Sequence, residues 1–177
     1  MKTCIHLCTV MALACFPVVL IPARANAQQA SGYGYAFAGP AAVSNIGIRS
    51  VAVNAGGGGE LWLGGGISFG GELGLLNFPA VERRSACCVD YASSANGLLL
   101  SANAFRHFGN GAKWRPFITG GLSVVSGGEA IGLFNAGGGV ERWISPHTGL
   151  RFEVRDQFGL AANPSVLLGL RVGLVLR

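Results

Sequence analysis

Lysine, cysteine and long apolar runs are scarce in most of this sequence. After residue 27 there is one lysine, Lys113, and the two remaining cysteines are the neighbours Cys87 and Cys88. A single adjacent pair cannot form a disulfide framework, and its spacing fits no metal-binding motif. No apolar run after residue 27 reaches the roughly 18 residues that a membrane-spanning helix needs. These absences exclude a disulfide-stabilised scaffold, a cysteine-based metal site and a helical membrane domain.

The first 27 residues have the features of a secretory signal peptide. A basic start precedes an apolar run over residues 10–21, and Ala25-Asn26-Ala27 provides a small-residue cleavage site. Pro17 and Pro22 interrupt the apolar run, which favours a cleaved signal over a membrane anchor. We therefore expect residues 1–27 to be removed and residues 28–177 to form one domain.

The chain is weakly charged and rich in glycine. Without Lys2 and Arg24 the formal charge falls from +5 to +3, which is too little for a nucleic-acid-binding surface. No nucleic acid is therefore expected as a partner. Half of the residues are hydrophobic and 29 of 177 are glycine, well above the usual glycine share of about 7%. A hydrophobic, glycine-rich, exported chain without helical spans is typical of a β-barrel.

Apolar and charged residues alternate most clearly near the C-terminus. In Leu150–Arg155 the apolar residues occupy even positions and the charged residues occupy odd positions. In Leu168–Arg177 the even positions are all leucine or valine, and the odd positions include glycine and Arg171. A period of two indicates a strand with two unlike faces. The pairing register is then strongly specified, because a slip by one residue would exchange the faces.

Eight segments have this strand-like pattern, and most have about the 9–11 residues that a tilted strand needs to cross a bilayer. They are Tyr33–Ala38, Val51–Leu63, Ile67–Leu76, Gly97–Phe108, Arg115–Val125, Ile131–Trp143, Gly149–Gln157 and Val166–Arg177. We expect Pro40 to end the first segment. The second, fourth and sixth connections are short turns, whereas the first (39–50) and third (77–96) are long. Short turns on the periplasmic rim and longer loops on the other rim are typical of outer-membrane barrels.

The two faces of these segments differ in charge and in size. One face is apolar and is expected to meet lipid, and the strands must then close into a barrel because open edges are not tolerated in hydrocarbon. The other face is rich in glycine and is expected to line a narrow lumen. Its charges are expected to pair with one another, because an unpaired buried charge is costly. This predicted lumen charge network consists of Glu60, Glu72, Glu141, Glu153, Arg151, Arg155 and Arg171.

The three tryptophans, Trp62, Trp114 and Trp143, each flank one of the short turns. Tryptophan gathers at membrane interfaces, so the positions predict an aromatic girdle on the periplasmic side. Burial of these rings in a core is the alternative. Trp62 and Trp143 share the parity of Glu60 and Glu141, so turning them toward lipid requires a bulge or the end of a strand.

The combined pattern of glycines, charges and apolar residues is best developed in three segments, Gly137–Trp143, Ser145–Asp156 and Leu170–Leu174. Through these segments the sequence resembles the small eight-stranded outer-membrane barrels of the OmpA/OmpX type, over about residues 33–177. The resemblance implies an all-β fold, namely a closed antiparallel up-and-down transmembrane β-barrel of about eight strands. It also implies a structural or surface-interaction role in the outer membrane of a Gram-negative-type bacterium.

The resemblance further implies two kinds of partner. These are outer-membrane lipids, including lipopolysaccharide, and the outer-membrane assembly machinery. Barrels of this type usually end in an aromatic residue that the machinery recognises, whereas this sequence ends Val175-Leu176-Arg177.

Neither catalytic residues nor a cofactor or metal site is expected. His107 and His147 are interpreted as rim residues without catalytic partners. The glycines at 56–59 lie within a strand and no helix follows, so they do not form a phosphate loop. A lumen charge network accounts for the glutamates without chemistry. Three alternatives stay open: a lipid-modifying barrel enzyme, a small-solute channel, and a secreted soluble barrel that binds an apolar ligand.

The segment 77–96 is the most distinctive exposed element of the predicted barrel. Loops carry function disproportionately, and Arg83 and Arg84 are candidates for binding lipopolysaccharide headgroups or an acidic surface partner. A solvated loop without a specific role is the alternative. Cys87 and Cys88 are expected to be exposed on this loop and not to be needed for folding.

Overall fold

The computed structural model describes residues 32–45, 48–79, 81–84, 89–92, 95–109, 113–127, 130–159 and 166–177. The expected signal peptide (1–27) and the Cys87–Cys88 pair lie outside these residues. The described residues form β1 (Gly32–Asn45), β2 (Ile48–Gly64), β3 (Ile67–Phe78), β4 (Val81–Arg84), β5 (Val89–Ala92), β6 (Ala95–His107), β7 (Trp114–Ser126), β8 (Ile131–Trp143), β9 (Thr148–Gly159) and β10 (Val166–Leu176). No helix that is long and apolar enough to cross a membrane occurs among them.

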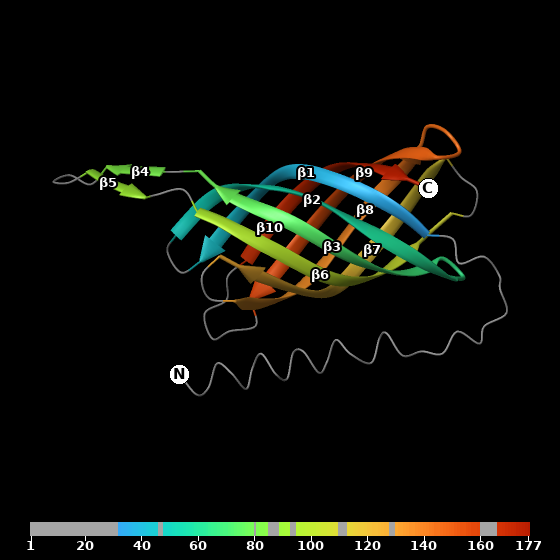
Figure 1. Ribbon diagram of the computed structural model, residues 1–177, viewed down its shortest axis with the longest axis horizontal. Helices are drawn as coiled ribbons and strands as arrows, with labels where there is room; N and C mark the ends of the chain where they lie inside the picture. The colour runs from blue at the N-terminus through green and yellow to red at the C-terminus, as the bar shows by residue number, and fades with distance from the viewer. Residues whose placement is uncertain are drawn as a thin grey trace, which may run out of the picture.

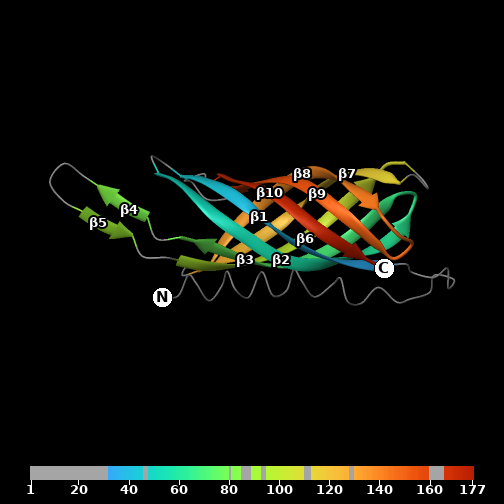
Figure 2. The same ribbon diagram turned by 90° about the horizontal axis from the view of Figure 1, so that it is seen from above.

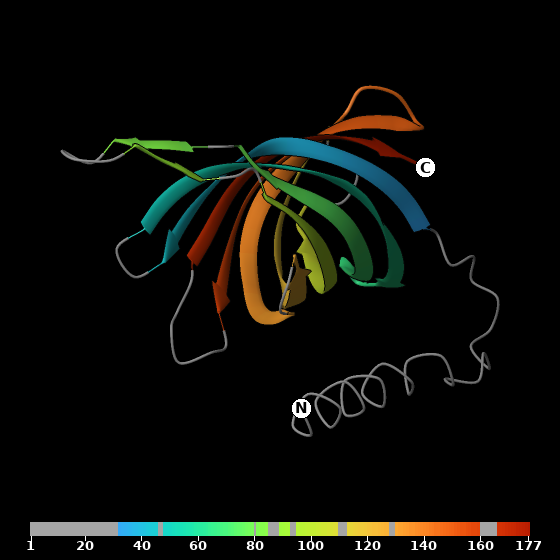
Figure 3. The ribbon, with the colours of Figure 1, turned by 60° about the vertical axis from the view of Figure 1, so that its left-hand side comes forward.

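Eight of the strands close into one antiparallel barrel. The order around the barrel is β1-β10-β9-β8-β7-β6-β3-β2, and β1 closes the barrel by pairing with both β2 and β10. Each strand lies beside its neighbour in the sequence, apart from the closing pair and from β3 and β6, which are separated by β4 and β5 (Figure 1; Figure 3). The predicted fold class, a closed up-and-down barrel of eight strands, is therefore confirmed.

Residue parity decides which side chains face the lumen. In β10 the even-numbered Leu170 is 53% exposed on the outer wall, whereas the neighbouring Arg171 is 3% exposed inside. The same alternation runs through β3, β6 and β9, as the period-two pattern predicts. The outer wall therefore presents mainly Leu, Val, Ile, Phe and small residues, while nearly all buried polar groups lie inside.

Two expectations about the first hairpin were wrong. Pro40 does not end the first strand, because β1 continues to Asn45. The pairing of β1 with β10 skips Gly39 and Pro40 but resumes at Ala41 without a change of register. Proline lacks the N–H that a hydrogen bond between strands needs, and here only the pairing at residues 39 and 40 is lost. Because β2 begins at Ile48, the first connection is short rather than long.

The segment 77–96 contains a second, two-stranded sheet. β4 and β5 pair antiparallel, with Arg83 opposite Asp90 and Arg84 opposite Val89. This hairpin extends away from the barrel at the end opposite the C-terminus (Figure 1; Figure 2). The third connection is therefore long, as expected, but part of it is a β-hairpin and not an irregular loop.

Glycines inside the barrel make room for aromatic rings. A Cβ atom added to Gly139 would lie 2.1 Å from the carbonyl oxygen of Phe152 and 2.8 Å from the Phe117 ring. A Cβ atom added to Gly58 would lie 2.9 Å from the ring of Tyr35. Only glycine fits at these lumen positions, because the neighbouring backbone and aromatic ring approach too closely for a Cβ atom. Gly59 of the outer wall is less confined, since a Cβ atom there would approach nothing closer than 3.5 Å.

We predict that Gly139→Val destabilises the barrel and that the matched outer-wall variant Gly59→Val does not. Overpacking against Phe117 should cost about 1–3 kcal/mol in the free energy of unfolding. Valine also has the higher strand propensity, so Gly59→Val should be neutral or stabilising. Urea unfolding in lipid vesicles, followed by tryptophan fluorescence, measures both. Equal losses of stability would contradict the packing role of the lumen glycine.

Candidate functional site in the barrel lumen

The lumen is filled by three successive layers of side chains. Toward the end that carries the β4–β5 hairpin, an apolar cluster of buried residues packs together, consisting of Ala41, Ala52, Leu76, Leu99 and Leu167. The charged residues occupy the middle of the barrel. Toward the short turns, a second cluster is built from the aromatic rings of Tyr33, Tyr35 and Phe37 with Val175, and Trp62 and Trp143 pack against it.

Glu72 is one centre of the charged layer. It accepts hydrogen bonds from the Tyr35 hydroxyl at 2.7 Å and from Arg171 Nη1 at 3.1 Å. Arg155 also donates to Glu72, and it forms a second ion pair with Glu153. These groups come from β1, β3, β9 and β10, so the contacts connect strands on different sides of the barrel.

Arg151 is the other centre. Its Nη1 donates to Glu60 Oε1 at 2.6 Å and to Glu141 Oε1 at 3.3 Å, and its Nε donates to Glu153 Oε2 at 3.1 Å. The guanidinium also lies over the rings of Phe117 and Tyr35, at 4.1 and 4.4 Å from the ring centres. A planar guanidinium can combine several carboxylate partners with stacking, which a lysine ammonium cannot do. The use of arginine in place of lysine inside the barrel follows from this geometry.

The structure brings all seven members of the predicted charge network together. Each of the four glutamates lies within 4.0 Å of at least one of the three arginines. Sequence reasoning missed the tyrosine hydroxyls, which complete the network because Tyr33 donates to Glu141 at 2.7 Å and Tyr35 donates to Glu72. The signal was available, since both tyrosines occupy alternate positions of the first strand, as lumen-facing residues do.

The expectation that His107 is a rim residue was wrong. Its side chain points into the lumen and is buried, with Nε2 at 2.9 Å from Glu60 Oε2. Nε2 also lies 3.4 Å from Ser68 Oγ and 3.5 Å from the Tyr33 hydroxyl. His107 is the last residue of β6 and pairs with Phe117 of β7. These neighbours depend on the register between strands, which the sequence of a single segment does not reveal. His147, by contrast, is exposed in a short turn at the rim.

Serine, histidine and carboxylate thus meet, but their arrangement differs from that of a nucleophilic triad. The Ser68 hydroxyl donates to Glu60 at 2.6 Å, a shorter contact than its 3.4 Å approach to His107. A nucleophile would instead donate to the imidazole and be open to substrate. Ser68 is completely buried. Among the described residues, no group of three or more His, Cys, Asp or Glu side chains is arranged to hold a metal ion.

Two of the three predicted girdle tryptophans face the lumen instead of the outer wall, which corrects the sequence interpretation. Trp62 and Trp143 pack against the lumen aromatic cluster, and the Arg115 guanidinium lies 4.8 Å from the Trp62 ring centre. Trp62 keeps the parity of Glu60, because the register shift in β2 comes only after Trp62. Trp143 keeps the parity of Glu141, because β8 pairs with β9 without a shift as far as Trp143. Trp114 alone faces outward, 50% exposed, and it stacks with Arg142.

Comparison with known proteins identifies the fold but no sequence family. No family model and no curated protein matches the sequence. Among solved structures, Neisserial surface protein A is similar with a TM-score of 0.64 and 13% identity, covering 84% of this chain and 99% of that chain. The N-terminal β-barrel domain of Pseudomonas aeruginosa OprF is similar with a TM-score of 0.56 and 22% identity, covering 84% and 98%. The chain therefore has the fold of the small eight-stranded outer-membrane barrels of the OmpA/OmpX type.

We predict that Glu72 and Arg171 are energetically coupled. Glu72→Ala leaves the buried Arg155 and Arg171 without their shared acceptor, and it should cost about 3–5 kcal/mol in the free energy of unfolding. The double variant Glu72→Ala/Arg171→Ala should cost less than the sum of the two single variants, by about 0.5–3 kcal/mol. Urea unfolding in lipid vesicles gives the four values of the cycle.

A matched control is Ser123→Ala combined with Arg171→Ala. Ser123 is also buried in the lumen, but its hydrogen-bond partners are Ser101 and Asn135 and do not include Arg171. The costs of these two changes should add. Additive costs in the Glu72 cycle as well would mean that the charges are not coupled.

Proposed function

We propose that this protein is an integral barrel of a Gram-negative-type outer membrane, exported through a cleaved signal peptide, with a structural or surface-interaction role. The barrel serves as an anchor in this proposal. The short turns face the periplasm, and the hairpin formed by β4 and β5 faces the exterior. The fold shared with Neisserial surface protein A and with the OprF barrel supports the location.

The filled lumen is the observation that carries the proposed role. Apolar side chains occupy one end, paired charges the middle and aromatic rings the other end. Small eight-stranded barrels are wide enough for side chains to fill the interior, and this filling argues against a solute channel. The outer wall supports membrane insertion, because large apolar side chains such as Leu73, Ile118 and Leu170 are more than half exposed. A soluble barrel would leave these side chains in water.

Surface contact is assigned to the β4–β5 hairpin, which extends beyond the barrel (Figure 2). Its sequence carries Arg83 and Arg84, which suit the phosphate groups of lipopolysaccharide or an acidic surface partner. The assembly machinery of the outer membrane is the other expected partner. A catalytic role has less support, because Ser68, the serine beside the buried His107, is inaccessible and is hydrogen-bonded to a glutamate. Expression of the protein should therefore leave the structure of lipid A unchanged.

The proposal predicts opposite accessibility for the two rims. An epitope tag inserted in the hairpin between β4 and β5 should be detected by antibody on intact cells. The same tag inserted in the short turn after Gly109 should be detected only after the outer membrane is permeabilised. The purified protein should show no defined conductance in planar bilayers.

If only the tag in the short turn were detected on intact cells, the topology would be the reverse of the proposed one. Recovery of the protein in the soluble periplasmic fraction would contradict membrane insertion. A reproducible single-channel conductance would favour the channel alternative.

A further inference from the structure

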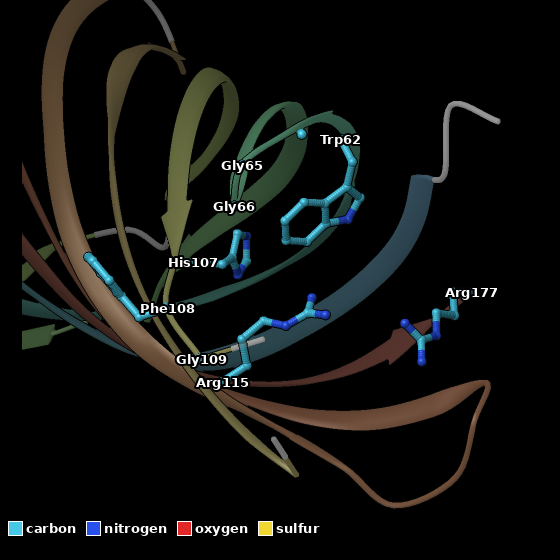
Figure 4. Close-up of a pocket in the computed structure, with 9 residues that line it drawn as sticks. Trp62, Gly65, Gly66, His107, Phe108, Gly109, Arg115 and Arg177 are labelled. Carbon is cyan, nitrogen blue, oxygen red and sulfur yellow. The ribbon is translucent and has the colours of Figure 1, made fainter. Parts of the chain in front are cut away.

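The pocket at the mouth of the lumen already contains the carboxylate that its basic side chains face. Its volume is about 310 Å³, and Trp62, His107 and Arg115 belong to its lining (Figure 4). Glu141 Oε2 lies 3.8 Å from Arg115 Nη1 and 3.9 Å from His107 Nδ1. A further anion would be repelled by this buried acid. The search for a binding surface therefore turns to the outer wall, where arginine side chains lie away from the glutamates.

An apolar groove crosses the outer wall over β8, β9 and β10. Its volume is about 350 Å³, and its outward-facing lining residues are Gly138, Val140, Phe152, Val154, Leu170 and Val172. They form two adjacent levels of the sheet, because Gly138 pairs with Val154 and Val140 pairs with Phe152. Gly138 has no side chain, whereas the lining residues of β9 and β10 are 41–53% exposed around it. The groove is therefore a depression in a wall of large apolar side chains.

A cation lies at the end of this groove that is nearer to the short turns. Arg142 is the next outward-facing residue of β8 after Val140, and such positions are about 7 Å apart along a strand. Its guanidinium lies 5.0 Å from the ring centre of the exposed Trp114, a stacking that leaves N–H groups open. Among the described residues, no carboxylate lies within ion-pair distance of Arg142. Asp156 pairs with Ala136, on the other side of the groove.

A second groove of the outer wall lacks such a cation. Its volume is about 460 Å³, and Gly57, Leu73 and Leu75 belong to its lining. The outward-facing positions of β2 and β3 between this groove and the short turns are all uncharged, namely Gly59, Leu61, Leu63, Gly71, Phe69 and Ile67. The combination of an apolar groove with an arginine at its end is therefore specific to β8–β10 in this comparison.

We propose that Arg142 and the β8–β10 groove together bind one phospholipid of the periplasmic leaflet. The Arg142 guanidinium holds two oxygens of the headgroup phosphate, the geometry in which this side chain binds oxyanions most strongly. The groove holds an acyl chain, which continues from the headgroup toward the middle of the bilayer. A cation followed by an apolar depression complements an anionic head followed by an apolar chain. This inference rests on the proposed insertion of the barrel in the outer membrane.

The test titrates a short-chain phosphatidylglycerol into the full barrel in non-ionic detergent micelles, at constant ionic strength. The indole N–H signal of Trp114 should shift saturably in NMR spectra, whereas the signals of the lumen-facing Trp62 and Trp143 should not. Arg142→Gln should weaken binding about tenfold or more, as expected for loss of a charge-assisted contact. The matched control is Arg106→Gln, because Arg106 also faces outward near the short turns but donates to the Gly65 carbonyl.

A second pair of variants tests the groove. Gly138→Leu fills it and should weaken binding about fivefold or more, because part of the acyl chain loses its contact. Gly57→Leu fills the other groove and should leave binding unchanged. The two changes are equally confined, since an added Cβ atom would lie 3.2 Å from the Phe117 carbonyl oxygen at Gly138 and 3.1 Å from the Tyr35 carbonyl oxygen at Gly57. Electrophoretic mobility before and after heating checks that each variant folds, and Arg142→Lys replaces Arg142→Gln if the latter does not.

Two partial ligands and two further measurements distinguish the outcomes. An equal response to glycerol 3-phosphate or to a short-chain diacylglycerol, or equal losses in the control variants, would overturn the lipid site. A dimer in sedimentation that Gly138→Leu converts to a monomer would place a second copy in the groove and would also overturn it. Flotation with lipid vesicles tests insertion separately. A barrel that floats but shows no saturable shift refutes the lipid site alone, whereas a barrel that does not float refutes the proposed function and this inference with it.

Discussion

The pairing of charges inside a closed lumen constrains the rest of this structure. Arg151 contacts three glutamates and Glu72 accepts from two arginines, and these side chains are at most 5% exposed. Removing one partner from such a group leaves a buried charge uncompensated, which costs far more than an exposed ion pair gains. A register slip by one residue would move Arg171 into the outer wall and Leu170 into the lumen. The charges therefore help to specify both the register of the strands and which face of each strand lines the lumen.

Space inside the lumen is the second constraint, and it follows from the first. Three arginines and several aromatic rings fit within eight strands only because the facing positions are often glycine, as Gly139 is beneath Phe117. The same rings stack on the guanidinium groups, so packing and charge compensation share atoms. A lumen filled in this way leaves the two rims as the places where the protein can meet other molecules. One rim carries the β4–β5 hairpin, and the other carries the short turns.

Features that depend on one strand could be predicted from the sequence, whereas features that depend on register between strands could not. Parity within each segment was sufficient to assign the seven network charges to the lumen. The partner of each charge, and the contact between His107 and Glu60, required cross-strand alignment. Trp62 and Trp143 show a different failure. Their parity indicates the lumen, whereas the general preference of tryptophan for membrane interfaces indicates the outer wall, and both rings follow parity.

The most direct measurement compares two adjacent residues of β7 in lipid vesicles. Leu122 is 56% exposed on the outer wall and Ser123 is 2% exposed in the lumen. Each is replaced by cysteine in a background without Cys87 and Cys88, and a thiol reagent dissolved in the lipid phase is added. A barrel with a lipid-facing wall and a filled lumen predicts labelling at position 122 and none at position 123. Labelling at 123 alone, or equal labelling at both, would contradict it.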